Sequence, residues 1–239
     1  MSRPTVTPGA AIGIMCKAPR PGRTKTRLAA TIGREAAAAL SACFLKDVAA
    51  AIGAMPKYLG RHGYGVYAPA GAEKELRQLL PPEFDLLLQV DCEFGNVLHS
   101  ATRDLLTLGH DCVILVNSDS PTLPTTLLVD AVEALRAPGD RMVLGPAIDG
   151  GYYLVGLKHA HRHLFTGIPW STNAVAQRTL DRSVEIGLEA VVLPEWYDID
   201  DAETLAILRD ELAARPTRFT GGGSAVSTRA YFSAVAAAQ

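Results

Sequence analysis

Cysteine is scarce in this chain, and its few cysteines form no recognisable metal or redox motif. They are Cys16, Cys43, Cys92 and Cys112. No CxxC pair occurs, and no cluster of histidine and cysteine has the spacing of a zinc site. The alternating His159, His161 and His163 lie in a polar stretch typical of a surface turn. We therefore expect reduced thiols, mostly as small core residues, and no catalytic role for the histidines.

An excess of charge of either sign is also missing. The chain has 23 lysines and arginines against 25 aspartates and glutamates, which gives a formal net charge of -2. Such a chain has no global basic field to hold a nucleic-acid backbone, so nucleic acid is not an expected partner.

Targeting and membrane-spanning patterns are not found either. Residues 1–8 lack the charged segment and long apolar stretch of a signal peptide. No apolar run is expected to be long enough for a membrane span. The expected location is the cytoplasm.

The chain does have an ordinary globular composition, with alternating strand and helix patterns. Its 239 residues, 48% of them hydrophobic, allow one large α/β domain. The patterns predict strands over 10–16, 63–68, 84–90, 112–116, 142–146, 152–157 and 190–193. They predict helices over 32–54, 72–80, 96–108, 125–135, 174–186 and 200–212.

This alternation predicts an α/β fold with a mainly parallel, mixed sheet that is flanked by helices on both faces. Residues 1–215 form the predicted domain, and residues 216–239 form a Gly/Ala-rich C-terminal tail. The tail contains the flexible run 221–224, and it either docks as a helix or is disordered. Whether the chain forms a homo-oligomer stays open.

A basic loop follows the first predicted strand, at the edge where open parallel sheets bind ligands. Its five basic residues are Lys17, Arg20, Arg23, Lys25 and Arg27. Gly22 allows the backbone to approach a ligand closely, and the helix that follows offers N-terminal donors to an anion. The loop is neither a Walker A sequence nor GxGxxG. We predict that Lys17, Lys25 and Arg27 bind phosphate; the alternative is a solvated basic loop.

Carboxylates follow the clearest strand and precede the last helix. Asp119 comes after the strand 112–116, where a carboxylate is costly unless it is used or paired. Magnesium takes one or two carboxylates together with phosphates and waters, whereas the alternative for Asp119 is a helix cap or a turn. Asp198 and Asp200 share one face of an extended stretch, which suits a ligand pair. Asp200 or Asp201 can instead cap the last helix.

A glycine turn lies between these two acidic loops. Asp149 is followed by Gly150 and Gly151, and two adjacent glycines permit tight backbone contact with a substrate. We predict that Asp149 binds a sugar or acceptor hydroxyl; the alternative is an ordinary Asp-Gly hairpin turn. The run 170–172 forms either an acceptor wall or the cap of the next helix.

Together these segments resemble the selenodomain-associated transferase group of bacterial proteins, within the GT-A nucleotide-diphospho-sugar transferase superfamily. The resemblance extends over residues 11–212, and the matching segments are 17–19, 22, 25–28, 118–121, 149–153, 170–172 and 198–200. Segment 25–28 also resembles the corresponding loop of phospholactate guanylyltransferases. Segment 198–205 resembles the last-helix signature of many nucleotidyltransferases.

The resemblance implies a Rossmann-like GT-A fold in which Asp119 and Asp200 hold Mg²⁺ or Mn²⁺ on a nucleotide. Further contacts to the nucleotide are expected from the basic loop, Ser118, Gly150 and Gly151. Two departures stand out. Asn117 occupies the first position of the DxD metal motif of glycosyltransferases, and segment 89–96 departs from the group's Gly-Asp-Leu-Gly run.

The resemblance also implies a transferase with a nucleotide or nucleotide-sugar donor and a small-molecule acceptor. The first expectation is glycosyl transfer, in which Lys25 and Arg27 offset charge on the leaving phosphate and Asp149 activates the acceptor. The second is nucleotidyl transfer from a nucleoside triphosphate with release of pyrophosphate, which the single carboxylate Asp119 favours. The third is a nucleotide-binding module without catalysis.

Overall fold

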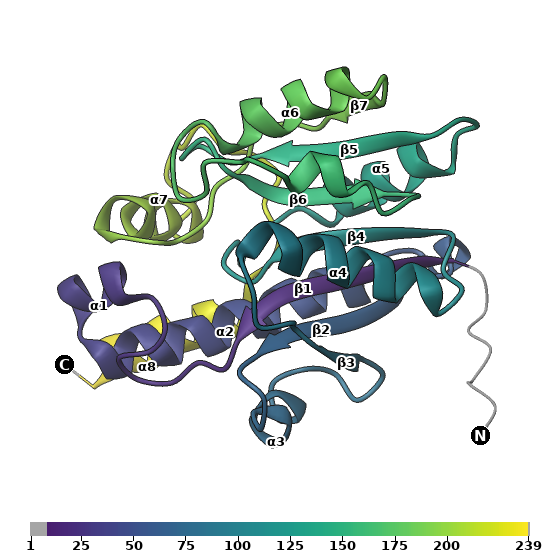
Figure 1. Ribbon diagram of the computed structural model, residues 1–239. Coiled ribbons are helices and arrows are strands. Elements are labelled where there is room, and N and C mark those ends of the chain that lie inside the picture. The colour runs from purple at the N-terminus through teal and green to yellow at the C-terminus, as the bar shows by residue number, and fades with distance from the viewer. Residues whose placement is uncertain (1–8, 239) are drawn as a thin grey trace.

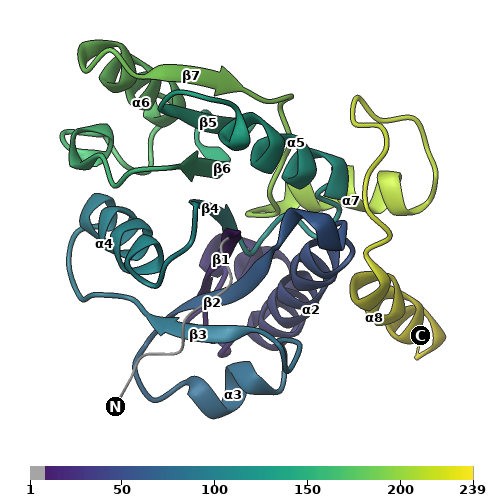
Figure 2. The same ribbon diagram turned by 90° about the vertical axis from the view of Figure 1, so that its right-hand side faces the viewer.

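The computed structural model describes residues 9–238, so the segment in which we predicted no signal peptide lies outside it. The described residues form a seven-stranded sheet between two layers of helices (Figure 1 and Figure 2). The strands are β1 (Ala10–Lys17), β2 (His62–Ala68), β3 (Asp85–Leu88), β4 (Cys112–Asn117), β5 (Arg141–Pro146), β6 (Tyr152–Leu157) and β7 (Glu189–Val192). The helices are α1 (Thr26–Ile32), α2 (Arg34–Gly53), η1 (Lys57–Leu59), α3 (Glu73–Arg77), α4 (Phe94–Thr107), α5 (Thr125–Arg136), η2 (Arg162–Phe165), α6 (Val175–Glu185), α7 (Ala202–Leu212) and α8 (Val226–Ala237).

The strand order is β3-β2-β1-β4-β6-β5-β7. Neighbouring strands are parallel except where β6 pairs antiparallel with β4 and β5. The carboxyl ends of all strands but β6 therefore lie at one edge of the sheet. The predicted α/β class and the mainly parallel, mixed sheet are confirmed.

Two apolar layers hold this sheet. Ile12 and Ile14 of β1 pack in one layer with buried residues of α2 and α5, whereas Ala11 packs in the other with residues of α4. This alternation follows from the period of two along a strand. Because β1 pairs on both sides, with β2 and β4, the loop that leaves its carboxyl end starts from a rigid support.

The first helical region differs from its prediction. We expected a loop up to Arg27 and one helix over 32–54, but α1 begins at Thr26, and Gly33, with φ 88°, separates it from α2. Lys25 is the N-cap residue of α1, in the left-handed conformation with φ 51° and ψ 50°. The basic loop is therefore shorter than predicted, and Lys25 has a fixed position at a helix start.

Helix α2 is long and apolar enough to cross a membrane by length and composition alone, which corrects the expectation that no segment reaches that limit. Of its apolar window, 56% is buried inside the protein, as in the core helix of a globular fold. Its buried Asp47 accepts hydrogen bonds from the backbone N–H groups of Ser227 and Thr228 at 2.8 and 2.9 Å. These bonds cap α8, so the tail contains a docked helix, one of the two alternatives expected for it.

Candidate functional site

Two acidic loops lie side by side at the carboxyl edge of the sheet. The loop after β4 carries Asp119, and the extended segment before α7 carries Asp200. The backbone N–H of Ile199 donates to the carbonyl oxygen of Asp119 at 2.9 Å. Ser120 Oγ donates to the carbonyl oxygen of Tyr197 at 2.8 Å. These bonds bring together carboxylates that are far apart in the sequence.

Lys25 lies between the two carboxylates. Its Nζ is 2.8 Å from Asp119 Oδ2 and 2.6 Å from Asp200 Oδ1, and only 6% of its side chain is exposed. Burial acts to lower the pKa of Lys25, but the charges of both aspartates outweigh it, so that the pKa is raised. Arg27 also pairs with Asp200. The ammonium group of Lys25 is therefore a buried, permanent positive charge.

Two residues at this site have an unfavourable backbone conformation. A left-handed conformation is unfavourable by about 1–2 kcal/mol for a residue other than glycine. Lys25 adopts it, and so does Ser171, with φ 65°, at the same edge. Backbone strain of this kind is typical of functional sites.

Four carboxylates line the two clefts at this edge, together with the basic loop. Asp149 and Asp198 add two carboxylates to the pair described above. Burial, together with the charges of Asp200 and Asp149, raises the pKa of Asp198 to about 7. For Asp200, burial acts to raise the pKa, but Lys25 and Arg27 lower it overall. Carboxylates this close together need cations nearby, which the basic loop or a bound metal ion can supply.

The pair Asp119 and Asp200 fits the divalent ion that the sequence implies. Each aspartate directs one oxygen at the same point, where the ammonium of Lys25 stands in for a cation. Carboxylate oxygens are suitable ligands for Mg²⁺ and Mn²⁺. The alternative of a helix cap for Asp119 does not apply, because α5 has Pro124 at its N-cap and no side-chain cap.

Two adjoining clefts open at this edge. The first, of about 620 Å³, is lined by the basic loop, Ser118 and Asp119. The second, of about 720 Å³, is lined by Asp149, Trp170 and Asp198 among others. The residues that line both are Thr26, Arg27, Phe94, Ser171 and Asp200. Each volume is in the range of small-molecule sites.

Not every predicted ligand residue lines a cleft. Lys17 and Ser118 line the first and Gly151 lines the second, whereas Gly22 and Gly150 line neither. Gly22, with φ 72°, lies in an exposed turn. Gly150, with φ 85°, lies against Asn173, whose carbonyl oxygen would be 2.1 Å from an added Cβ. Both glycines therefore shape the backbone around the site.

Two aspartates, Asp149 and Asp201, have the structural roles expected as alternatives, a turn and a helix cap. Asp149 Oδ1 accepts a hydrogen bond from the Gly151 N–H at 2.8 Å within the β5–β6 turn, while Asp149 also lines the second cleft. Asp201 caps α7 through a reciprocal capping box with Thr204. Asp200 precedes that cap, so its carboxylate is available to the site.

Sequence reasoning missed part of the cleft lining. Phe94 packs edge-on against Trp170, with ring centroids 5.0 Å apart, where the two clefts meet. Gln89 and the buried Ser41 line the first cleft. Segment 89–96 departs from the pattern of the resembled group, and Ser41 lies inside an Ala-rich helix, so neither carries a sequence signal.

Comparison with known proteins supports the fold. Residues 62–172 match the model of a family described as "Uncharacterized protein conserved in bacteria" (DUF2064). No curated protein matches the chain. A crystal structure described as a "putative nucleotide-diphospho-sugar transferase" from Desulfovibrio desulfuricans is 27% identical, with a TM-score of 0.81. The match covers 97% of this chain and 96% of that one.

More distant structures share the fold. CMP:2-keto-3-deoxy-manno-octonic acid synthetase in complex with CTP is 12% identical, with a TM-score of 0.56 over 86% of this chain and 99% of that one. Glucosyl-3-phosphoglycerate synthase from Mycobacterium tuberculosis, with Mn²⁺ and UDP, is 12% identical, with a TM-score of 0.50 over 88% and 80%. These comparisons confirm the predicted GT-A-like fold. The assignment to transferases is confirmed by the match with the D. desulfuricans protein.

Proposed function

We propose that this chain is a metal-dependent transferase that takes its donor from a nucleotide-activated compound, with glycosyl transfer from a nucleotide-diphospho-sugar as the first candidate. The nucleotide and its phosphates occupy the first cleft. The transferred group and a small-molecule acceptor occupy the second.

The observation that carries this proposal is the ion-pair cluster of Lys25, Asp119 and Asp200 in the first cleft, of which Asp200 also lines the second. It combines a cation-binding carboxylate pair with a lysine that has no other described ion-pair partner. In the proposed complex a phosphate group pairs with Lys25, and its metal ion binds the two carboxylates. The 27% identity with the D. desulfuricans protein, over nearly the whole of both chains, favours a sugar donor.

In the proposed glycosyl transfer, the acceptor hydroxyl oxygen forms a bond with the anomeric carbon. The bond from that carbon to the diphosphate oxygen breaks, and the nucleoside diphosphate leaves. Asp149, exposed in the second cleft, takes the acceptor proton. Lys25 and Arg27 stabilise the negative charge on the leaving diphosphate. Mg²⁺ or Mn²⁺ on Asp119 and Asp200 supplies further charge neutralisation there.

Nucleotidyl transfer is the second candidate. In this reaction an acceptor oxygen attacks the α-phosphorus of a nucleoside triphosphate, and pyrophosphate leaves. One observation favours it: Asn117 stands where the DxD motif has its first carboxylate, and its Oδ1 accepts from the Asp119 N–H at 3.3 Å. The Asn117 side chain thus hydrogen-bonds to the backbone of the loop. A nucleotide-binding module without catalysis would bind the same compounds and release no product.

A ligand panel separates these candidates. Thermal denaturation with nucleoside triphosphates and nucleotide-sugars, each with and without Mg²⁺ or Mn²⁺, should show metal-dependent stabilisation. A preference for nucleotide-sugars supports the first candidate, and a preference for triphosphates supports the second. Binding without turnover of any acceptor supports the module.

Two variants test the metal ligands in the same assay. Asp119→Asn and Asp200→Asn should abolish metal-dependent stabilisation by nucleotide while the fold persists. Asp181→Asn, which removes an exposed carboxylate from α6, is the matched control and should respond like the parent. Full metal-dependent stabilisation of either site variant would refute its assignment as a ligand.

A further inference from the structure

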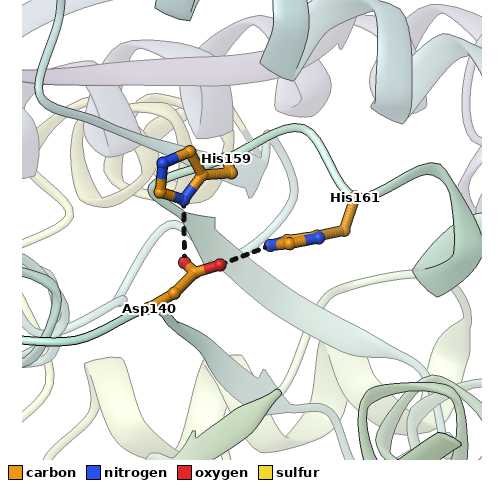
Figure 3. A group of neighbouring side chains, drawn as sticks. All are labelled: Asp140, His159 and His161. Atoms are coloured by element: carbon orange, nitrogen blue, oxygen red, sulfur yellow. Dashed lines mark hydrogen bonds and ion pairs between the residues drawn. The ribbon is translucent and has the colours of Figure 1, made fainter. Parts of the chain in front are cut away.

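A second polar cluster lies at the opposite edge of the sheet (Figure 3). Asp140 immediately precedes β5, and His159 and His161 follow β6. Because β5 and β6 are antiparallel, the start of β5 and the end of β6 lie at the same edge. That edge is remote from the strand ends that carry the carboxylates of the candidate site.

The three side chains converge on a small volume. His159 Nδ1 lies 3.0 Å from Asp140 Oδ1, and His161 Nε2 lies 2.7 Å from Asp140 Oδ2. One ligand atom from each residue lies within 4.8 Å of the others. Figure 3 shows both imidazole rings directed at the carboxylate from the same loop.

Hydrogen bonding leaves part of this cluster unsatisfied. Asp140 Oδ1 is shielded from solvent and has no hydrogen-bond partner among the described residues, although the His159 nitrogen is close. A buried polar atom without a partner is unusual and calls for an explanation such as a bound ion. The approach of His159 thus fits two ligands beside a common cation better than a donor and its acceptor.

No lysine or arginine among the described residues forms an ion pair with Asp140. Arg141 pairs with Glu189 at 3.0 Å, and Lys158 donates to the carbonyl oxygen of Ala137 at 2.7 Å. The two histidines are therefore the described ion-pair partners of Asp140.

Two imidazole nitrogens and one carboxylate oxygen are typical ligands of a transition metal such as Zn²⁺, with water in the fourth position. Zinc binds such atoms at about 2.0–2.2 Å, so the three groups need only small shifts to accept it. His159, whose side chain is 68% exposed, has the freedom to make the largest shift.

We propose that Asp140, His159 and His161 form a binding site for a divalent transition-metal ion, expected to be Zn²⁺, separate from the nucleotide site. The ion ties the turn between α5 and β5 to the loop between β6 and η2. Its role is structural, since the catalytic edge of the sheet lies at the other end of the same strands.

Equilibrium dialysis of metal-stripped protein against Zn²⁺ tests the proposal. Excess Mg²⁺, which prefers oxygen ligands, competes with Zn²⁺ for the carboxylates of the nucleotide site, where Lys25 already opposes the binding of a lone metal ion. A Cys92→Ser background removes the exposed thiol, which would compete for zinc. The protein should then retain a single Zn²⁺ per chain.

His159→Gln and Asp140→Asn should each weaken zinc binding about ten-fold or more. His159 is mostly exposed, so its replacement leaves the fold intact. His163→Gln is the matched control, because His163 pairs with Glu185 at 2.7 Å and is not one of the three clustered residues. Its zinc affinity should equal that of the parent. The proposal is overturned if the parent retains no zinc, or if His159→Gln and Asp140→Asn retain it as tightly as the parent.

Discussion

Lys25→Ala should make the protein less stable without metal and responsive to metal alone. In the parent, the Lys25 ammonium lies 2.8 and 2.6 Å from the carboxylates of Asp119 and Asp200. Its removal leaves Asp200 paired with Arg27, and Asp119 with no ion-pair partner among the described residues. Mg²⁺ can then occupy the point at which both oxygens are directed.

The expected magnitude follows from the exposure of the groups. A hydrogen bond to a charged group contributes about 1.5–3 kcal/mol, and Lys25 makes such contacts with both carboxylates. The carboxylate side chains are 25% and 31% exposed, so solvent screening reduces the net loss to about 2 kcal/mol. For a domain of this size that loss lowers Tm by about 4–8 °C. Lys46→Ala, on the exposed side of α2, is the matched control and should leave Tm unchanged.

The assay is thermal denaturation over a series of Mg²⁺ concentrations without nucleotide. An ion at 100 times its Kd stabilises a protein by about 2.7 kcal/mol, so Mg²⁺ should restore most of the loss in Lys25→Ala. The parent should gain less, because Mg²⁺ must displace the ammonium there. A variant that is as stable as the parent, or that gains no more from Mg²⁺ than the parent does, would refute a cation site between Asp119 and Asp200.

Three further substitutions have distinct expected outcomes. Arg27→Ala should keep the parent's stability, since the Arg27 side chain is 69% exposed. It should weaken nucleotide binding about ten-fold in calorimetric titration. Unchanged affinity would show that Arg27 is a surface residue without a role in nucleotide binding. Gly150→Ala should lower the urea midpoint more than Gly71→Ala, because both have φ near 85° but only Gly150 has a neighbour, Asn173, in the way. Burial chiefly lowers the pKa of His110 below its ordinary 6.5, so the unfolded chain binds that proton more readily. The free energy of unfolding should therefore fall as pH drops below 6.5. In denaturant titrations across that pH range, the fall should be smaller for His110→Gln than for the parent. An equal fall in both proteins would show that His110 does not cause this pH dependence.

The sheet could be predicted because its central strands are short apolar runs that end in polar loops. The predicted ranges 10–16 and 112–116 differ from β1 and β4 by one residue at the carboxyl end. In a parallel sheet such runs place their following loops at one edge, so the proximity of Asp119 to the basic loop followed from the topology alone.

Other features depend on contacts that no local pattern contains. The buried position of Lys25 has no local signal, because its partner Asp200 lies 175 residues away in the chain. The cluster at the other edge was missed for a similar reason. His159 and His161 meet Asp140 only because β6 runs antiparallel to β5, a direction that the alternation of strands and helices does not reveal.

The ion pairs of Lys25 also bear on the order of binding in the proposed reaction. A metal ion that arrives alone must displace an ammonium group that already neutralises Asp119 and Asp200, so it gains little free energy. A nucleotide that arrives alone must draw Lys25 away from both carboxylates and leave them unpaired. A metal–nucleotide complex supplies the carboxylates with a cation and Lys25 with a phosphate at the same time. The exchange therefore makes the binding of metal and nucleotide cooperative, and each should raise the affinity of the protein for the other by the same factor.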